Sequence, residues 1–353
     1  MPSSEKMSRR AFAALTAAAV ALPAAAAVRP PPTTMLRPLI KPPRLRFGDT
    51  IALIAPGGRT NDEAIAKAVA RIEQLGFKAR LGANLRAIHG NYGGTVQQRR
   101  EDLHAMFADR EVKALWCIRG GSGCISLLAS LDYQLIRANP KILLGYSDIT
   151  ALHLAILRHA GLITFHGPVA SSTESDYSTH HMLAVLMDPQ PVYTIPMALE
   201  NLERGKTEPQ YALRTVTPGR ASGPLIGGNL SMVAALAGTP YAAEFRDAIL
   251  FIEEVNEEPY RIDRWMTQLD LAVGLRHAAA VMLGICENCG PQGDDIALSL
   301  DATLDQHLAP LTIPAVSGYS FGHIRNQFTL PMGLQARLDT ASQTLTLLEA
   351  AVV

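Results

Sequence analysis

The chain has 353 residues, with 32 basic and 32 acidic side chains and therefore a formal net charge of zero at pH 7. A hydrophobic content of 48% can supply a large buried core, and the length predicts two domains or one elaborate domain. Residues 1–27 hold three basic side chains and one acidic side chain, so the remainder carries 29 basic and 31 acidic groups. Without an excess of basic charge, the composition does not indicate a nucleic-acid-binding protein.

The N-terminus has the pattern of an export signal. Ser8-Arg9-Arg10-Ala11-Phe12 precedes an apolar, alanine-rich stretch that ends at Leu22, and Pro23 and four alanines follow. This pattern predicts a twin-arginine signal peptide over residues 1–27, cleaved after Ala27, and a periplasmic or otherwise extracytoplasmic mature protein. The apolar part is shorter than the roughly 20 residues that a spanning helix needs, so we expect no stable membrane insertion after cleavage. Residues 28–44, which are rich in proline, are predicted to be a linker.

Residues 45–175 alternate between predicted strands and helices. Apolar runs predict buried strands at residues 51–54, 112–118 and 142–144, and apolar periodicity predicts intervening helices, including one that ends at Gly76 and others within 103–107 and 127–131. Strands that are nearly all apolar and alternate with helices are typical of a mostly parallel sheet covered on both faces. In such a sheet, ligands bind at the carboxyl ends of the strands.

The rest of the chain predicts a second domain. Residues 176–222 lose the strand and helix rhythm and are interpreted as a connection. Residues 223–353 are predicted to form a β-rich α/β domain with strands at 248–252, 279–283, 313–316 and 344–348 and one amphipathic helix over 259–274. The predicted fold class is therefore α/β, with an N-terminal, mostly parallel sheet domain and a C-terminal β-rich domain.

A serine stands at a predicted strand-to-helix turn. The strand that precedes it ends at Gly145, Ser147 follows within two residues, and helical periodicity begins at Asp148 and ends at Gly161, a predicted C-cap. This order is typical of a nucleophile elbow, although Ile149 occupies the position of the second glycine in the usual G-x-S-x-G pattern. The alternative interpretation is that Ser147 or Asp148 only caps the helix.

A nucleophilic serine needs a base, and the base needs an orienting carboxylate. His323 lies on a glycine-flanked segment after an apolar run, and His166 is the rival base. Glu253 ends an all-apolar strand, where an acid is costly to bury without a partner. The glycine turn over residues 119–123 could supply amides to an oxyanion, whereas it lacks the full G-x-G-x-x-G pattern of a dinucleotide site. Taken singly, each of these residues is more often structural than catalytic.

The four cysteines do not indicate a metal site. Cys117 and Cys124 flank the glycine turn, and Cys286 and Cys289 form one C-x-x-C pair without a second pair or a nearby histidine. A zinc site is therefore not expected, and a disulfide or two buried thiols is the better interpretation. We expect no metal and no organic cofactor.

Six ordered segments together resemble those of a known enzyme family. They resemble, in order, segments of the LD-carboxypeptidases, a serine peptidase family that includes murein tetrapeptide carboxypeptidases and microcin C immunity peptidases. The likeness spans about residues 45–350. The segments are Arg119-Gly120-Gly121, residues 145–152, Thr164-Phe165-His166-Gly167-Pro168, Gly227-Gly228-Asn229-Leu230, residues 252–257 and Phe321-Gly322-His323. The resemblance implies a Ser147, Glu253, His323 triad, with the serine on the N-terminal domain and the other two residues on the C-terminal domain.

The resemblance also implies an activity. The expected reaction is hydrolysis of the L,D bond that releases terminal D-alanine from murein tetrapeptides, in peptidoglycan turnover. The amides of Gly121 and Asp148 are the expected oxyanion hole. Candidate substrate-binding residues are Arg119, Ser122, His166, Asn229 and Arg261. Many family members have a tyrosine at the position of Ser122, which leaves the substrate preference open, and the export signal departs from the well-known murein-recycling members, which work in the cytoplasm.

Two alternatives stay open. The same triad could act on a peptide-nucleotide antibiotic or another acylated amino acid, as the immunity peptidases do. The chain could instead be a non-catalytic periplasmic binding protein. The expected partner is a murein peptide, and a homodimer is possible.

Overall fold

The computed structural model describes residues 38–292 and 296–353, so the predicted signal peptide and most of the predicted linker lie outside the described residues. The first of its two sheets has six strands in the order β12-β5-β4-β3-β1-β2. The strands are parallel except β12, which pairs antiparallel with β5. They are β1 (Thr50–Ile54), β2 (Lys78–Leu81), β3 (Val112–Cys117), β4 (Ile142–Gly145), β5 (Phe165–His166) and β12 (Leu330–Pro331). A mostly parallel N-terminal sheet is thus confirmed.

The helices of this part follow the strands along the chain: α2 (Asp62–Gln74), α3 (Val96–Ala108), α4 (Tyr133–Ala138) and α5 (Thr150–Ala160). Their ends follow from local chemistry, because side chains of Asn61 and Thr95 accept backbone hydrogen bonds at the starts of α2 and α3. The predicted C-cap is also present, since Gly161 has a left-handed φ of 70° after α5. The segment expected to be a helix at 127–131 is instead a 3₁₀ helix, Cys124–Ser130.

The second sheet has eight strands in the order β6-β14-β13-β8-β9-β10-β11-β7. Its centre, β8 to β11, is parallel, and the flanking strands β6, β7, β13 and β14 run antiparallel to their neighbours. The strands are β6 (Tyr193–Ile195), β7 (Arg214–Thr217), β8 (Arg220–Asn229), β9 (Ile249–Glu253), β10 (Ala280–Ile285), β11 (Ala315–Gly322), β13 (Gln335–Asp339) and β14 (Thr344–Leu347). This is a mixed sheet within an α/β fold, as expected for the C-terminal part.

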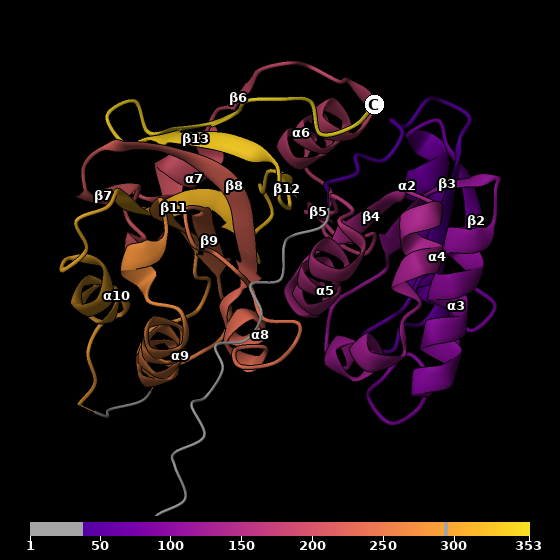
Figure 1. Ribbon diagram of the computed structural model, residues 1–353, viewed down its shortest axis with the longest axis horizontal. Coiled ribbons are helices and arrows are strands. Elements are labelled where there is room, and N and C mark those ends of the chain that lie inside the picture. The colour runs from indigo at the N-terminus through magenta and orange to yellow at the C-terminus, as the bar shows by residue number, and fades with distance from the viewer. Residues whose placement is uncertain (1–37, 293–295) are drawn as a thin grey trace, which may run out of the picture. The chain divides into compact units, whose positions relative to one another are not determined.

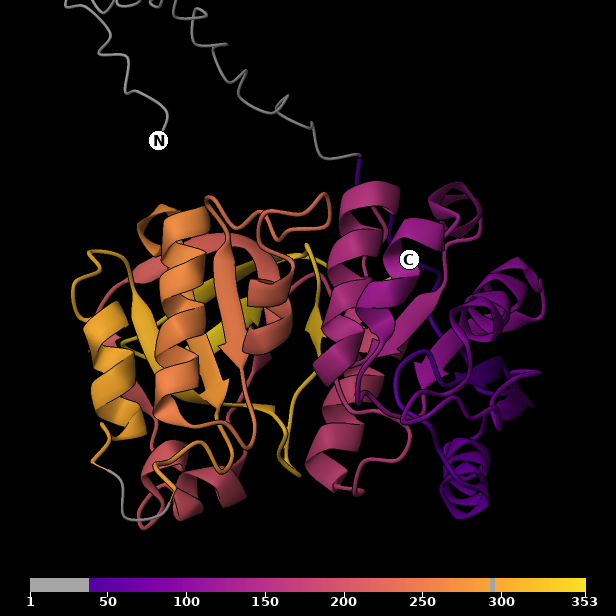
Figure 2. The same ribbon diagram turned by 90° about the horizontal axis from the view of Figure 1, so that it is seen from below.

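Five further helices follow along the described chain: α6 (Asp176–Met187), α7 (Leu199–Arg204), α8 (Leu230–Ala235), α9 (Pro259–Ala272) and α10 (Leu300–Leu308). Helix α6 packs on the first sheet, where Met182, Leu183 and Leu186 lie together with Ile51, Trp116 and Leu144. Figures 1 and 2 show α8, α9 and α10 side by side on one face of the second sheet. The apolar stripe of α9 is buried through Ile262, Met266 and Leu269, so core packing accounts for it. None of the helices within residues 38–292 and 296–353 is long and apolar enough to cross a membrane.

The structure departs from the expected domain outline in two places. Residues 176–222, interpreted as a connection, contain α6, α7, β6 and β7, and both strands join the second sheet. Strand β12 lies in the first sheet although it comes from the C-terminal part, because Leu330 pairs with His166 (Figure 1). A strand of two residues has no period to read from a sequence, and its pairing is decided only by the folded neighbours.

The core lies on and between these strands. Every residue of β4, β9, β10 and β11 is buried. All four cysteines are buried and carry free thiols. Of the two interpretations of Cys286 and Cys289, the structure has buried thiols and not a disulfide. The carboxyl ends of β1, β3 and β4 lie on one edge of the first sheet, and those of β9, β10 and β11 lie on one edge of the second. Ser147 lies at the first edge, and Glu253 and His323 lie at the second.

Candidate active site

Ser147 lies at a sharp turn between β4 and α5. Its backbone has a φ of 65°, a left-handed conformation that costs a serine about 1–3 kcal/mol. A short 3₁₀ helix, Ser147–Ile149, leads from the turn into α5. The helix expected from Asp148 therefore begins with a tighter turn. The strained serine between a buried strand and a helix has the backbone form of a nucleophile elbow, even though Ile149 replaces the usual second glycine.

The glycine turn after β3 lies directly against Ser147. A methyl group at Gly120 would come 2.8 Å from Cβ and 3.1 Å from Oγ of Ser147, so only glycine permits this approach. The Gly120 carbonyl accepts a 2.7 Å hydrogen bond from the amide of Gly58, which ties the turns after β1 and β3 together. Gly121, whose amide was predicted to bind an oxyanion, therefore belongs to a turn that is fixed beside the Ser147 hydroxyl.

Asp148 fastens the same turn from the other side. Its buried carboxylate accepts a 2.8 Å hydrogen bond from the backbone amide of Cys124. Cys124 begins the 3₁₀ helix that follows the glycine turn. The side chain of Asp148 is thus a structural anchor, and its predicted part in an oxyanion hole concerns only its backbone amide.

His323 and Glu253 form a buried pair at the ends of β11 and β9. Nδ1 of His323 lies 2.7 Å from Oε2 of Glu253, whose side chain is fully buried, while the His323 side chain is 17% exposed. The contact requires Gly322, which has a φ of 121° and passes so close to Glu253 that a methyl group there would lie 3.2 Å from the glutamate Cβ. With Nδ1 engaged by the carboxylate, Nε2 is the histidine nitrogen left to exchange a proton.

The pair favours its charged form. Burial alone would lower the pKa of His323, but the charge and hydrogen bond of Glu253 and the charge of Glu254 outweigh it, so the pKa is raised above 6.5. For Glu253, burial acts to raise the pKa, and the charge and hydrogen bond of His323 overcome it, so the pKa lies below its usual range. The carboxylate therefore stabilises an imidazolium, which is what a general base needs while it holds a proton.

Two contacts bring this pair to the serine turn. The ring of Tyr146, the residue before Ser147, lies 4.6 Å from the ring of His323, centroid to centroid. On the other side, the amide of Asn229 donates a 3.0 Å hydrogen bond to Oγ1 of Thr150, three residues after Ser147. Asn229 is in register with Glu253 on the adjacent strand. The structure therefore gathers Ser147, Glu253, His323 and the glycine turn into one place.

Glu254 was not singled out from the sequence. Its buried carboxylate accepts hydrogen bonds from the side chain of Asn229 and the amides of Ser231 and Val255 at 2.9–3.0 Å. Burial and the charge of Glu253 raise its pKa. Through these hydrogen bonds, Glu254 links the end of β8 to the end of β9, beside the Glu253–His323 pair. Two adjacent glutamates at the end of an apolar strand are visible in the sequence. The pattern does not say which glutamate contacts His323 and which contacts Asn229.

The predicted substrate-binding residues fall into two groups. Arg119, Ser122 and Arg261 have polar atoms outside the core, where they contact the Arg59 carbonyl, the Asn91 side chain and Glu257 respectively. The side chains of His166 and Asn229 are instead buried, and their predicted part in substrate binding stays a prediction. His166 is fully enclosed, next to Tyr146, His153 and Phe251, and Asn229 is committed to capping α8 and to Glu254. The enclosure of His166 on β5 depends on contacts between the two sheets, such as its contact with Phe251 on β9, which no local sequence pattern reveals.

His166 is buried without satisfying its polar atoms. Neither ring nitrogen has a hydrogen-bond partner among the described residues, and Oε1 of Glu253 is in the same condition. Burial lowers the pKa of His166 to about 4, with the charge of Glu253 opposing the shift, so the ring is neutral at pH 7. Because its ring is fully enclosed, His166 is less accessible to a substrate than His323, whose side chain is 17% exposed. Among residues 38–292 and 296–353, no group of three or more His, Cys, Asp or Glu side chains is arranged to hold a metal ion.

Comparison with known proteins agrees with this geometry. Residues 51–167 match the model of the LD-carboxypeptidase N-terminal domain, and residues 222–338 match that of the LD-carboxypeptidase C-terminal domain. The chain is 38% identical to the "Probable murein peptide carboxypeptidase" of Bacillus subtilis (strain 168) over 86% of its own length and 93% of that protein. It is 32% identical to the murein tetrapeptide carboxypeptidase of Pseudomonas aeruginosa, over 82% of its own length and 92% of that protein.

Solved structures extend the similarity to the fold. The microcin C7 self-immunity protein MccF, in complex with glutamyl sulfamoyl guanosine, has a TM-score of 0.81 and 25% identity, with 89% of this chain and 99% of that chain covered. The muramoyltetrapeptide carboxypeptidase of Oxalobacter formigenes has a TM-score of 0.72 and 28% identity, with 84% and 97% covered. Both domain models match in order, and the relatives from Bacillus subtilis and Pseudomonas aeruginosa each exceed 30% identity over most of the chain. The protein belongs to the LD-carboxypeptidase family of serine-type hydrolases.

Proposed function

We propose that the protein is an extracytoplasmic murein tetrapeptide carboxypeptidase that releases terminal D-alanine by serine catalysis. The observation that carries the proposal is the buried His323–Glu253 pair beside Tyr146 and the strained Ser147 turn. A serine, a histidine with one free nitrogen and a buried carboxylate are the three parts of an acyl-transfer site. The murein substrate is supported by the names of relatives in Bacillus subtilis and Pseudomonas aeruginosa.

In the proposed reaction, Nε2 of His323 takes the proton of the Ser147 hydroxyl as Oγ attacks the carbonyl carbon of the scissile amide. The negative charge that develops on the carbonyl oxygen is bound by the backbone amides of Gly121 and Asp148, each worth on the order of 3 kcal/mol in the transition state. The C–N bond then breaks, and His323 gives its proton to the amine of D-alanine. Water attacks the acyl-enzyme through the same histidine, which releases the shortened peptide and restores Ser147.

A direct test incubates residues 28–353 with murein tetrapeptide and follows D-alanine by mass spectrometry. Stoichiometric D-alanine and tripeptide are the expected products. Labelling of Ser147 by a fluorophosphonate without any D-alanine release would keep the serine chemistry and contradict the murein substrate. If the fluorophosphonate does not label Ser147 and no D-alanine is released, the result would favour the alternative of a non-catalytic binding protein.

The second candidate substrate is a peptide-nucleotide antibiotic or another acylated amino acid. Its support is the fold similarity to MccF, whose structure was solved with glutamyl sulfamoyl guanosine. The same assay, run with an aminoacyl sulfamoyl nucleoside in place of the tetrapeptide, separates the two candidates. A ratio of kcat/KM that favours the nucleoside would reassign the substrate and leave the mechanism unchanged.

The acidic limb of the pH profile should report His323. Only neutral imidazole can accept the serine proton, so kcat/KM rises as the pH rises through the pKa of His323. Since Glu253 and Glu254 raise that pKa above 6.5, we expect the half-maximal point of this limb above pH 6.5. Initial rates between pH 5 and 9 at low substrate concentration measure it. A half-maximal point well below pH 6.5 would mean that burial outweighs the two glutamates.

The export proposal depends on the N-terminal sequence alone. If Arg9 and Arg10 form a twin-arginine signal, replacing both by lysine should hold the protein in the cytoplasm of a bacterial host. Cell fractionation followed by immunoblotting measures the distribution. An unchanged extracytoplasmic fraction would contradict this route of export, and a cytoplasmic wild-type protein would contradict export altogether.

A further inference from the structure

Glu253 and His166 both carry buried polar atoms without protein partners. Oε2 of Glu253 is engaged by His323, whereas its other oxygen, Oε1, has no hydrogen-bond partner among the described residues. Both ring nitrogens of His166 also lack a partner, and the side chain has no exposed surface. Each of these groups loses its hydration when the chain folds, so leaving both unmet is costly. The cost falls if an unmet donor and an unmet acceptor share a bound water.

The two side chains lie around the same aromatic rings. The ring of His166 lies 5.4 Å from that of Phe251, centroid to centroid, at an interplanar angle of 76°. Phe251 and Glu253 are two positions apart on β9, so their side chains point to the same face of the sheet. The ring of Tyr146 is 6.1 Å from His166 and 4.6 Å from His323. His166 therefore lies beside the Glu253–His323 pair, although it comes from the first sheet.

The charges of these groups agree with this placement. Burial lowers the pKa of His166 to about 4, and the charge of Glu253 opposes this fall. For Glu253, burial acts to raise the pKa, and the charges of His323 and His166 act to lower it. The two side chains are therefore within electrostatic range of each other, and no direct hydrogen bond joins them. Polar groups at such a separation are commonly bridged by water.

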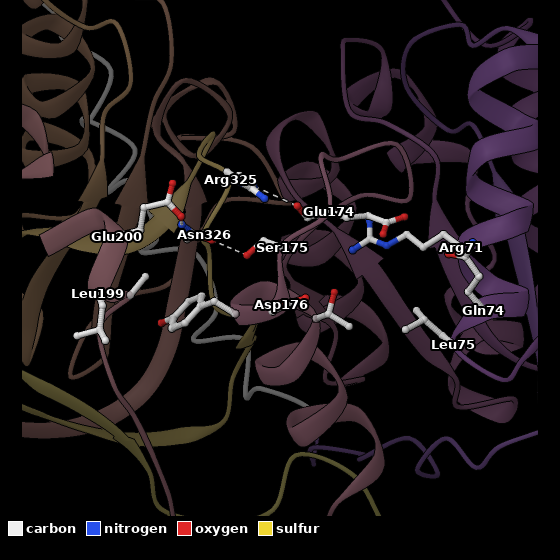
Figure 3. A pocket seen from close by; sticks show the side chains of 13 residues that line it. Arg71, Gln74, Leu75, Glu174, Ser175, Asp176, Leu199, Glu200, Arg325 and Asn326 are labelled. Atoms are coloured by element: carbon white, nitrogen blue, oxygen red, sulfur yellow. Dashed lines mark hydrogen bonds between the residues drawn. The ribbon is translucent and has the colours of Figure 1, made fainter. Parts of the chain in front are cut away.

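Arg71 has an unmet nitrogen in different surroundings. One terminal nitrogen of its guanidinium lacks a partner within residues 38–292 and 296–353. This side chain, however, lines a cavity of about 630 Å³ and extends toward the carboxylate of Glu174, as Figure 3 shows. The carboxylate and the open cavity account for the guanidinium without a further role. His166 has no exposed surface, so an open cavity does not explain its unmet nitrogens in the same way.

His153 provides a second contrast. It is as fully buried as His166, and the two rings lie 6.4 Å apart, centroid to centroid. Its ring nitrogens lie 2.9 Å from the Thr164 hydroxyl and 2.9 Å from the Gly145 carbonyl oxygen. His153 is thus held by its own hydrogen bonds, as expected of a structural histidine. His166 has no such bonds and lies beside a carboxylate with one unmet oxygen.

We propose that His166 is a positioning residue that holds Oε1 of Glu253 through one bound water. The neutral ring donates its N–H to the water, and the water donates to the carboxylate oxygen. Glu253 is then fixed by both oxygens, one through His323 and one through the water. A fixed carboxylate keeps the imidazole of His323 aligned to take the proton of Ser147. This inference rests on the serine mechanism of the proposed function and adds a residue that acts through Glu253.

Two substitutions of His166 test this role. His166→Phe keeps a flat ring and removes the N–H donor, whereas His166→Gln keeps a donor in a smaller side chain. We expect His166→Phe to lower kcat for D-alanine release about 10-fold with KM unchanged, because a hydrogen bond to a buried charge is lost. His166→Gln should recover kcat to within about 3-fold of wild type, because its amide can still donate. Steady-state rates of purified variants measure both parameters. A rise in KM without a fall in kcat would overturn the positioning role.

Thr164→Val is the matched control for loss of a buried hydrogen bond. It removes the hydroxyl that pairs with His153, two residues before His166, and keeps the shape of the side chain. We expect a lower melting temperature and an unchanged kcat. An equal fall in kcat for Thr164→Val and His166→Phe would mean that loosening of this layer explains both, which would overturn the proposal.

A double-mutant cycle tests whether His166 acts through Glu253. In the Glu253→Gln background the carboxylate charge is already absent, so adding His166→Phe should lower kcat by less than about 2-fold. An undiminished loss in this background would show that His166 acts independently of Glu253, contrary to the proposal. A high-resolution crystal structure should place a water within about 3.2 Å of both Oε1 and one ring nitrogen of His166. Density without such a water would rule out the bridge.

Labelling of Ser147 by a fluorophosphonate separates this inference from the murein substrate. The labelling rate depends on His323 and Glu253 and does not require a murein peptide. Slower labelling of His166→Phe, by about 10-fold, in a protein that releases no D-alanine would support the positioning role and contradict the murein substrate. Equal labelling rates and equal kcat for wild type, His166→Phe and His166→Gln would overturn the positioning role and leave the carboxypeptidase intact.

Discussion

Ser147→Ala is expected to reduce D-alanine release by on the order of 10⁶-fold while the protein stays folded. The loss follows from the removal of the nucleophile, and the residual rate would come from the oxyanion amides and substrate binding alone. Alanine removes only the hydroxyl of Ser147, and the backbone strain at φ 65° persists. Purified variants are compared by D-alanine release and by thermal unfolding.

Ser147→Gly is the matched control for this experiment. Glycine adopts positive φ at no steric cost, so this variant should unfold at a temperature equal to or above that of Ser147→Ala while being equally inactive. The difference in melting temperature between the two variants measures the backbone strain at the turn, and their shared loss of turnover measures the contribution of the hydroxyl. Turnover retained by either variant in a preparation free of host peptidases would remove Ser147 from the proposed mechanism.

Glu253→Gln is expected to lower turnover by on the order of 10³–10⁴-fold with little change in melting temperature. A glutamine carbonyl can still accept the hydrogen bond of His323, but the charge that stabilises the imidazolium is gone. Burial then becomes the main influence on the histidine, so its pKa falls and the acidic limb of the pH profile moves to lower pH. Steady-state rates as a function of pH measure both effects.

Glu254→Gln separates the two adjacent glutamates. Both oxygens of Glu254 accept hydrogen bonds from the protein, so an amide nitrogen in either place would face a donor and lower the melting temperature. Its effect on turnover should be much smaller than that of Glu253→Gln. Should the reverse pattern appear, with Glu254→Gln inactive and Glu253→Gln near wild type, the orienting carboxylate would be Glu254.

Much of the fold could be predicted because its central strands are continuous apolar runs. The strands around residues 51–54, 142–145, 249–253 and 280–285 are buried on both faces, and the strand at 112–117 is buried except at Lys113. Strands buried in this way have nearly all-apolar sequences, which can be recognised directly. Strand β8 is harder to predict from the sequence, because glycines and a proline interrupt its apolar pattern at Gly223, Pro224, Gly227 and Gly228. Strand β12 could not be predicted, since it has only two residues and is defined by its pairing with β5, which is far away in the sequence.

The sequence by itself determined the types of residue at the site and their order along the chain. Ser147 after a buried strand, Glu253 at the end of another and His323 beside Gly322 were each visible, and the six ordered segments connected them to one family. A local pattern records strand ends and turns because these depend on neighbouring residues. It does not record distance between residues that are 70 or more positions apart.

Only the tertiary structure decided which polar residues meet. It paired His323 with Glu253 and not with Glu254, and it enclosed His166, the rival base, behind Tyr146 and Phe251. It also set α2 beside the segment of residues 170–174, with a cavity of about 540 Å³ between them. Pairing and enclosure depend on how two sheets pack against each other, which is a property of the whole chain. Local sequence patterns therefore named the candidates, and choosing among them took the family resemblance or the folded structure.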